Sequence, residues 1–511
     1  MKWLNNIVDE LVAKHPDGEI LIESGSSPSG SYHLGHLREL VTCDAILLEL
    51  RRRGRSARHI QFVDDLDALR KIPANIPSSF EEYLGYPLCD VPSPENEFDS
   101  YAGYFLDGLK QACEILGVEV DYVRAHEKYR EGFYVPAIEK ALENLAQAKQ
   151  SLETVAGRKL DDNWSPIQVM ESGRLKNRKF ISLDKDNKTL VYEDKEGQQQ
   201  TVRYDNGEVK LDWRLDWPGR WWLQAVAIEP SGRDHMTKGG SYDTGVQIVR
   251  DIYGAEPPMP VAYDFINMAG DTKKMSASKG TGLDALEGAQ IMPAEVVRYF
   301  ILRSSPSKRL SFDPVNGLVQ LMDEYAAFSA KTDKTEAEER LYYICTRGKA
   351  ANHRVSQVPF SHLVACYQAA LKDFDKTIHL VKQTEHGELA DSEKEIIKSE
   401  LAFIDRWLEK RAPEEVKFSI LEDINKLALT DEQKNYLSQL ATKIEAAPVE
   451  ADGHWFHSAI YEFKDQTELE PKALFQTLYE VLIGKTSGPR AGWFLSILPR
   501  EWLIDRLRLA K

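Results

Sequence analysis

Residues 26–39 read SSPSGSYHLGHLRE, and this stretch decides how the N-terminal part of the chain is expected to fold. It follows a short apolar segment at 19–23 and precedes a run at 34–48 in which apolar residues recur every three or four positions. This order predicts a strand, a tight loop and an amphipathic helix. A second apolar segment at 59–63 predicts another strand, so the chain begins with a βαβ unit.

Two histidines lie at the expected start of this helix. His33 and His36 are three residues apart, so their side chains project from one face of the first turn. Gly30 and Gly35 allow a phosphate chain to approach the backbone, and the free N–H groups of a helix N-terminus attract anionic oxygens. An isolated HxxH spacing is usually a surface or capping feature. Its position after a strand and a Pro-Ser-Gly loop favours an anion-binding site.

The α/β pattern is interrupted after the second strand and resumes with apolar runs at 223–228 and 261–266. Beyond about residue 313 the pattern is almost entirely helical. We therefore predict an α/β fold in which a Rossmann-type nucleotide-binding domain is split by an insertion and followed by an all-α domain. The predicted segments are the first half of the nucleotide-binding domain at 1–75, a mixed insertion of helices and hairpins at 76–219, the second half at 220–270, a connecting region at 271–330 and the helical domain at 331–511.

Composition limits the classes of function. With 511 residues, 42% of them hydrophobic, the chain is expected to be a multidomain globular enzyme. A formal net charge of −16 argues against a protein that coats nucleic acid nonspecifically and favours recognition through defined patches. The five scattered cysteines fit a reducing compartment, and no apolar run approaches the roughly 20 residues that span a bilayer. A cytoplasmic location without membrane contact is expected.

Several segments of the sequence resemble motifs of a known enzyme family. HLGH resembles the H-I-G-H signature of class I aminoacyl-tRNA synthetases, and TKKMSASKG at 272–280 resembles their K-M-S-K-S loop. The usual second lysine of that loop is Ala277 here, and Lys279 follows as its substitute. EPSGRDHMTKGGSYDTG at 229–245 resembles a block of the class I lysyl-tRNA synthetases. Three other segments resemble the same family, namely DDLDALRKIP (64–73), LDWPGRWW (215–222) and SGPRAGWFLSIL (487–498).

The resemblance implies an enzyme that activates lysine with ATP and Mg²⁺ and transfers it to tRNA(Lys). It implies catalytic roles at the α-phosphate and the leaving pyrophosphate for His33, His36, Lys274 and Lys279. ATP would also contact Ser29, Gly30, Gly35, Asp234, Met275, Ser276 and Ser278. The lysine pocket would comprise Gly25, Ser27, Trp221, His235 and Tyr242, and the need for an ammonium acceptor adds Glu23 and Asp65 to it. Unpaired tRNA bases would be read in the helical domain by Arg490 and Trp493, although Arg490 could instead cap or pair within the helices.

The side-chain ammonium of lysine needs an acceptor at the end of its apolar stem. A carboxylate is expected, because charge-assisted hydrogen bonds contribute roughly 1.5–3 kcal/mol. Glu23 and Asp65, at predicted strand ends, are favoured, and Asp64 and Asp243 come next. Other roles remain open: the two neighbouring aspartates could bind ribose or fix a turn, Glu23 could face solvent, and Trp221 could be core packing. The expected aromatic walls of the pocket are Trp221 and Tyr242.

The chain departs from its relatives in the insertion. Relatives often hold zinc there through cysteine and histidine clusters, but the matching segments PIQVMESG (166–173) and ENEFDSYAGYF (95–105) contain neither residue. Zinc needs about four such ligands, so no zinc is predicted.

Two alternatives to lysine–tRNA ligation remain at this point. One is another class I specificity, such as glutamate or cysteine, and the other is a paralogue that binds tRNA or amino acid without charging. Pyrophosphate exchange with a panel of amino acids, with and without tRNA, separates these alternatives.

The missing zinc ligands generate a first prediction. Purified protein should contain well below one zinc per chain, and its activity should survive zinc chelation once Mg²⁺ is restored. Elemental analysis and pyrophosphate exchange measure the two quantities. One tightly bound zinc per chain would contradict the prediction.

Overall fold

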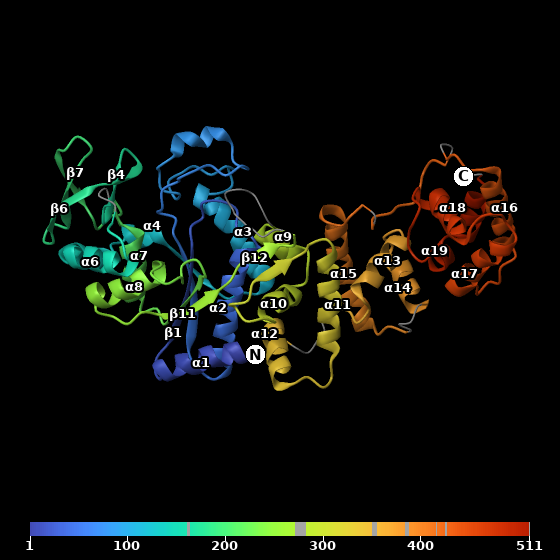
Figure 1. The fold of residues 1–511 in the computed structure, drawn as a ribbon, viewed down its shortest axis with the longest axis horizontal. Helices are drawn as coiled ribbons and strands as arrows, with labels where there is room; N and C mark the ends of the chain where they lie inside the picture. Colours follow the sequence, from blue (N-terminus) through green and yellow to red (C-terminus); the bar gives the residue numbers. More distant parts are fainter. Residues whose placement is uncertain are drawn as a thin grey trace. The chain divides into compact units, whose positions relative to one another are not determined.

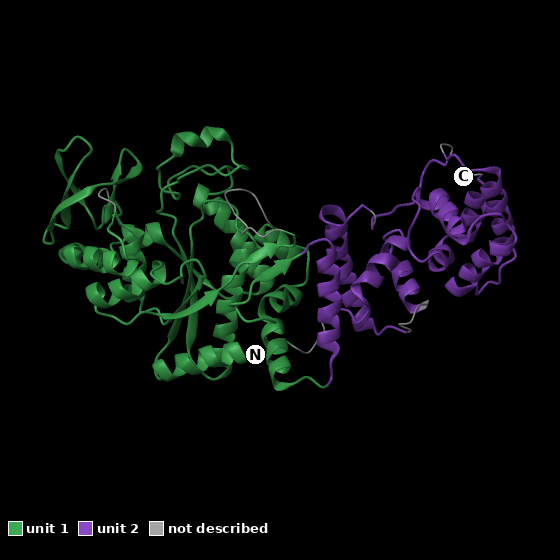
Figure 2. Ribbon diagram, viewed as in Figure 1, with its two compact units in different colours: residues 1–312, 333–350 green, residues 313–332, 351–511 purple. Residues whose placement is uncertain are grey.

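The computed structural model separates into two compact units (Figure 2). Unit 1 consists of residues 1–312 and 333–350, and unit 2 of residues 313–332 and 351–511. The residues that the structure describes are 1–160, 164–270, 283–349, 355–383, 388–414, 416–424 and 427–509.

A five-stranded parallel sheet forms the centre of unit 1, and its strand order is β11-β10-β1-β2-β3. Figure 1 labels β1 and β11 of this sheet. β1 and β2 are buried along most of their length, as expected for a parallel sheet covered on both faces. The strand order reverses direction at β1 and β10, which is where such sheets bind ligands beyond the strand carboxyl ends. The strands are β1 (Ile20–Ser26), β2 (Ala57–Val63), β3 (Asp121–Arg124), β10 (Ile228–Gly232) and β11 (Met259–Tyr263).

Helix α2 (Leu34–Arg52) begins at this carboxyl edge. His33 caps it through a reciprocal pair of hydrogen bonds with His36, which satisfies N–H groups that a helix start leaves without partners. The helix ends just before Gly54, whose φ of +75° is a left-handed conformation that glycine adopts without strain. The predicted strand, loop and helix are confirmed.

Helices and two small antiparallel sheets, β5-β4-β9 and β6-β7-β8, occupy the predicted insertion. β3 also falls within 76–219 but joins the main sheet as its edge strand, contrary to the predicted boundary. It has four partly or fully exposed residues, so it carries no apolar alternation. The other elements here are η1 (Ser78–Tyr83), α3 (Tyr101–Leu116), α4 (Ala125–Arg130), α5 (Val135–Glu143), α6 (Leu145–Ala156), β4 (Ile167–Glu171), β5 (Arg174–Asn177), β6 (Lys179–Asp184), β7 (Thr189–Glu193), β8 (Gln199–Arg203) and β9 (Val209–Leu211).

The rest of unit 1 includes a helix from beyond the predicted start of the helical domain at 331. Helix α12 (Glu336–Thr346) belongs to unit 1, because the buried carboxylate of Asp44 on α2 binds Arg347 at 2.5 Å and Arg298 at 2.6 Å. The remaining elements are α1 (Lys2–Lys14), α7 (Trp213–Gln224), α8 (Ser241–Ile248), η2 (Val249–Tyr253), β12 (Ile266–Met268), α9 (Ala285–Gln290), α10 (Ala294–Leu302) and β13 (Leu310–Phe312).

All secondary-structure elements in the described residues of unit 2 are helices, as predicted. Helices α17 and α19 pack very closely, since a Cβ on Gly492 would lie 2.1 Å from the carbonyl oxygen of Gly453. The helices are α11 (Asn316–Ala330), α13 (Phe360–Ala369), α14 (Phe374–Gln383), α15 (Asp391–Lys410), α16 (Asp431–Glu445), α17 (Gly453–Tyr461), η4 (Glu462–Asp465), α18 (Pro471–Ile483), α19 (Ala491–Ile497) and α20 (Arg500–Leu507).

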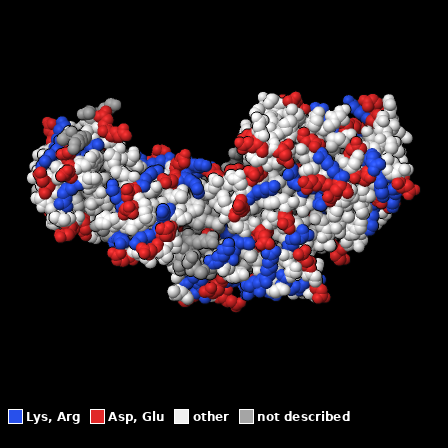
Figure 3. All heavy atoms as spheres, turned by 180° about the vertical axis from the view of Figure 1, so that it is seen from behind, with Lys and Arg blue, Asp and Glu red and all other residues white. Residues whose placement is uncertain are grey.

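Two surface properties bear on function. No helix in the described part of the chain is long and apolar enough to cross a membrane. Lys and Arg are interspersed with Asp and Glu on the face that Figure 3 shows.

Candidate active site

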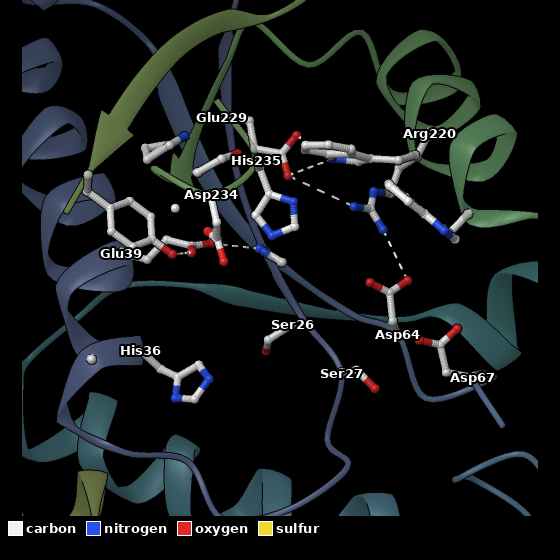
Figure 4. A pocket seen from close by; sticks show the side chains of 18 of the residues that line it. Ser26, Ser27, His36, Glu39, Asp64, Asp67, Arg220, Glu229, Asp234 and His235 are labelled. Atoms are coloured by element: carbon white, nitrogen blue, oxygen red, sulfur yellow. Dashed lines mark hydrogen bonds and ion pairs between the residues drawn. The ribbon is translucent and has the colours of Figure 1, made fainter. Parts of the chain in front are cut away.

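A cavity of about 430 Å³ lies at the carboxyl edge of the parallel sheet, a volume within the range of small-molecule sites. Its walls come from the ends of β1, β2 and β10, the first turns of α2 and one side of α7 (Figure 4). The residues that line it include Gly25, Ser26, Ser27, His33, Gly35, His36, Glu39, Asp64, Asp67, Lys210, Asp216, Trp217, Arg220, Glu229, Asp234, His235, Tyr263, Phe265 and Ile266.

The first turn of α2 brings its two histidines together. His33 Nδ1 accepts a hydrogen bond from the N–H of Gly35 at 3.1 Å, and His36 Nδ1 accepts one from the N–H of His33 at 3.1 Å. The ring centroids lie 4.0 Å apart. A Cβ on Gly35 would lie 2.8 Å from the His33 ring, so this arrangement needs glycine. Both imidazoles therefore line the cavity in orientations that the backbone fixes.

Arg220 of α7 is the central buried cation. Its Nε lies 2.6 Å from Glu23, its Nη1 3.2 Å from Asp64 and its Nη2 3.9 Å from Glu229, and it stacks over the ring of Phe62 at 4.0 Å. Burial raises the pKa of Asp64 to about 7, and it also raises the pKa values of Glu23 and Glu229. A further cation entering the cavity would stabilise the ionised forms of these buried carboxylates.

Glu39 faces the cavity from α2, on the side opposite Asp64 in Figure 4. It accepts hydrogen bonds from the N–H of Gly25 at 2.9 Å and from the hydroxyl of Tyr263. No Lys or Arg in the described part of the chain forms an ion pair with it. Burial raises the pKa of Glu39 to about 8. The site thus contains a carboxylate without a resident cation.

Aromatic rings form another wall. The Nε1 of Trp217 donates to Glu229 at 2.8 and 3.0 Å, and Trp221 Nε1 donates to the same carboxylate. The Trp217 ring lies 5.9 Å from the ring of His235, and both line the cavity. Trp221 is buried behind Trp217, with Tyr242 at 5.6 Å from it.

The insertion also contributes Lys210, on β9, to the lining of the cavity. Its buried ammonium lies 3.0 Å from Asp67 and 3.6 Å from Asp216. Among the described lining residues, six carboxylates face only two side chains of permanent positive charge, Lys210 and Arg220. This imbalance favours a ligand that carries positive charge.

Comparison with known proteins agrees with this geometry. A family model described as tRNA synthetases class I (K) matches residues 1–347, and an anticodon binding domain model matches residues 396–511.

The chain belongs to the class I lysyl-tRNA synthetase family.

Curated relatives match over the whole chain. A protein named lysine–tRNA ligase 1 from Methanosarcina acetivorans is 36% identical over 100% of this chain and 98% of its own length. A lysine–tRNA ligase from Archaeoglobus fulgidus is 34% identical over 100% of both chains. One from Pyrococcus horikoshii is 33% identical over 99% of both chains.

Seven of the residues assigned by resemblance to the class I lysyl-tRNA synthetases line the cavity: Gly25, Ser27, His33, Gly35, His36, Asp234 and His235. Ser29 and Gly30 belong to the preceding loop outside the lining, where the carbonyl of Ser29 accepts from Tyr101 at 3.3 Å. Trp221 and Tyr242 support the wall from behind, and the Tyr242 hydroxyl donates to the carbonyl of Pro258 at 2.7 Å. Five assigned residues lie outside the described residues, namely Lys274, Met275, Ser276, Ser278 and Lys279.

The two favoured ammonium partners point elsewhere. Glu23 is fully buried against Arg220 and does not line the cavity. Asp65 is fully buried too, and it accepts hydrogen bonds from Arg124 and from the N–H of His126 at 2.9 Å. Both carboxylates have structural partners and lie outside the cavity lining, so their role as ammonium partners stays a prediction, which this geometry does not favour. Asp64, next in line, does reach the cavity, whereas Asp243 accepts from the N–H of Gly239 at 2.8 Å outside it.

Several residues that line the cavity were not predicted as site residues, although the motifs that contain some of them were identified. Glu39 closes the HLGH segment three residues after His36, which places it on the same helix face. Trp217 and Arg220 lie within LDWPGRWW, and Glu229 begins EPSGRDH. Tyr263 and Lys210 had no signal in the sequence.

A second cavity, of about 390 Å³, lies within unit 2 and contains both predicted tRNA contacts. Arg490 is exposed at the start of α19, and its side chain makes no capping hydrogen bond, which removes the capping alternative. The half-buried ring of Trp493 packs against Gly453 and lies 5.2 Å from the ring of His454. The other lining residues include Pro359, His362, Cys366, Leu380 and Phe494.

The charge balance predicts that lysine binding tightens as the pH rises from about 6 to about 8. Burial raises the pKa of Asp64 to about 7 and that of Glu39 to about 8, so free protein holds part of these carboxyls protonated. A bound ammonium favours the ionised forms, and each displaced proton changes affinity by up to about tenfold per pH unit. Calorimetry in two buffers of different ionisation enthalpy measures the proton release. A pH-independent affinity would contradict this reasoning.

Proposed function

We propose that the cavity of unit 1 forms lysyl-adenylate from lysine and ATP and that the lysyl group is then transferred to tRNA(Lys). Family membership over the full chain carries this proposal, since the relatives named lysine–tRNA ligase match both units from end to end. The acid-rich lining supports it, because lysine brings two ammonium groups. Lysine-dependent pyrophosphate exchange, followed by charging of tRNA(Lys), tests the activity.

The first step is an in-line attack of the lysine carboxylate on the α-phosphate. His33 and His36 lie at the N-terminus of α2, where the imidazoles and the positive end of the helix dipole can stabilise the charge that develops on phosphate oxygens. We assign the pyrophosphate side to Lys274 and Lys279 by resemblance. In the second step a ribose hydroxyl of the tRNA 3′ end attacks the lysyl carbonyl and AMP leaves. Neither step requires a covalent protein intermediate.

Mg²⁺ is included in the proposal as the partner of ATP. No group of three His, Cys, Asp or Glu residues in the described part of the chain is arranged to hold a metal by itself. Mg²⁺ commonly binds through substrate phosphates and one or two carboxylates, and Asp234 lines the cavity for such a role. The ion would neutralise phosphate charge.

Glu39 is the proposed partner of the lysine side-chain ammonium. It combines three properties: it lines the cavity, its pKa is raised by burial, and it lacks a cation among the described residues. Tyr263 and the N–H of Gly25 fix its two oxygens. The stem would lie along Trp217, whose indole provides apolar and cation–π contact. Asp64, across the cavity, would face the α-ammonium.

Replacing Glu39 by glutamine should collapse the discrimination between lysine and norleucine, which lacks the amine. In the native site norleucine leaves Glu39 desolvated and unpaired, so a discrimination of about 10⁴ in kcat/KM is expected. Glu39→Gln should reduce this ratio by at least about 10² while KM for ATP stays within about threefold. The ratio is measured by pyrophosphate exchange.

Asp67→Asn is the matched control for this experiment. It changes a lining carboxylate into an amide, but Asp67 already pairs with Lys210. Its lysine-to-norleucine ratio should remain that of the native enzyme. An unchanged ratio in Glu39→Gln would place the ammonium partner elsewhere.

The cavity of unit 2 is the proposed site for an unpaired tRNA base. The Trp493 ring offers a stacking surface, and the exposed Arg490 offers donors to base edges. The anticodon binding domain model covers both residues.

Trp493→Ala should therefore weaken tRNA recognition without affecting adenylate formation. Base stacking on an aromatic ring contributes about 1–3 kcal/mol, which corresponds to a rise of about 5- to 150-fold in KM for tRNA. Trp455→Ala, on α17 and outside the cavity lining, is the control and should leave this KM unchanged. Charging assays give KM, and pyrophosphate exchange checks unit 1. A native KM in Trp493→Ala would refute the assignment.

A further inference from the structure

Arg38 makes an unusual set of contacts from the second turn of α2. Its side chain is 1% exposed, yet no carboxylate in the described part of the chain pairs with it. Its guanidinium donates instead to backbone carbonyls. Nη1 donates to Asp264 at 2.6 Å and Phe265 at 3.2 Å, and Nη2 donates to Ser305 at 3.4 Å, Pro306 at 2.8 Å and Lys308 at 2.5 Å.

These carbonyls belong to two segments that lie side by side. Residues 264–265 lead into β12 and residues 305–308 lead into β13, and the two strands pair with Ile266 opposite Leu310. The N–H of Asp264 also donates to the carbonyl of Pro306 at 2.9 Å. One guanidinium thus satisfies buried acceptors of both segments and joins them to α2.

The anchored segment is a wall of the active site. Tyr263, Phe265 and Ile266 line the cavity, on a segment that Arg38 holds through the carbonyls of its residues 264 and 265. The adjacent residue on α2, Glu39, accepts the hydroxyl of Tyr263. Two consecutive residues of α2 therefore fix this wall relative to the helix turn that carries His33 and His36.

We propose that Arg38 is a positioning residue for adenylate formation, which holds the wall of Tyr263, Phe265 and Ile266 at the separation from the first turn of α2 that the reacting groups require. Arg38 does not line the cavity, so it acts through this wall. Displacement of a reacting group by about 1 Å can lower a rate by about 10²-fold. Lysine cannot substitute, because an ammonium has three donors and lacks the planar fork that reaches both segments.

Arg298 provides a matched control in the same unit. Its side chain is also 1% exposed, and it donates to Asp44 at 2.6 Å and to the carbonyl of Ile344 at 3.0 Å. None of these hydrogen bonds reaches the cavity wall or a lining residue. Loss of a buried arginine there changes stability without moving the wall.

The test measures kcat and KM in lysine-dependent pyrophosphate exchange, per active site as counted by adenylate burst. Arg38→Lys should lower kcat about 100-fold with both KM values within about threefold, while Arg298→Lys keeps its kcat. Ethylguanidinium should raise kcat at least about tenfold in Arg38→Ala and leave Arg298→Ala unchanged. A native kcat per active site in Arg38→Lys overturns the proposal, as does a loss confined to KM.

A second variant decides the matter if Arg38 substitutions prevent folding. Arg309, with a half-exposed side chain, donates to the carboxylate of Asp264 at 3.3 Å, beside Arg233, which donates to the same carboxylate at 3.0 Å. Arg309→Ala should keep the native melting temperature and lower kcat about three- to tenfold, and an unchanged kcat overturns the proposal. The inference rests on the proposed function, but the two can fail separately. Absence of lysine-dependent pyrophosphate exchange in the native enzyme refutes the function. Native rates of this exchange in the variants refute only the role of Arg38.

Discussion

The burial of one guanidinium among three carboxylates is the interaction on which unit 1 depends. Glu23 comes from β1, Asp64 follows β2 and Glu229 comes from β10, and Arg220 of α7 lies 2.6, 3.2 and 3.9 Å from them. Desolvated carboxylates at neighbouring strand ends repel one another, and breaking such a buried pair costs about 3–5 kcal/mol. Because α7 follows the insertion and precedes β10, the same contact fixes how the two halves of the split domain meet.

Most of the architecture was predictable because it is carried by local patterns. The strand, loop and helix around HLGH, the resumption of the α/β pattern and the helical second half all follow from apolar spacing and turn residues. The exceptions have long-range causes. β3 is short and exposed, so only its pairing with β2 defines it. Helix α12 joins unit 1 through Asp44, which lies about 300 positions earlier and leaves no trace in the local pattern.

The site was predictable by segment but not by side chain. Asp64 and Asp65 are neighbours just beyond β2, and their side chains point to opposite sides. Asp64 lines the cavity and Asp65 binds Arg124, and the sequence alone does not reveal which of the two faces the cavity. Glu23 ends a recognised strand segment, yet its direction depends on Arg220, nearly 200 residues later. Glu39 carries no distinguishing signal in the sequence, because acids on helices are commonly solvated and only the fold brings Tyr263 and the N–H of Gly25 to its carboxylate. The family resemblance indicates the reaction, whereas the tertiary contacts determine which side chains reach the cavity.

The excess of acids over resident cations in the cavity also limits what a medicinal chemist could place there. If the proposed pairing of the two ammonium groups holds, a non-hydrolysable adenylate mimic must keep both amines, because acylating either one would leave a buried carboxylate without its partner. Such a molecule carries two positive charges at one end and a negative charge at the other, which hinders passive entry into cells. Potency and permeability therefore oppose each other at this site. Chemical diversity is better explored along Trp217, where an apolar surface tolerates changes of shape that leave the charges in place.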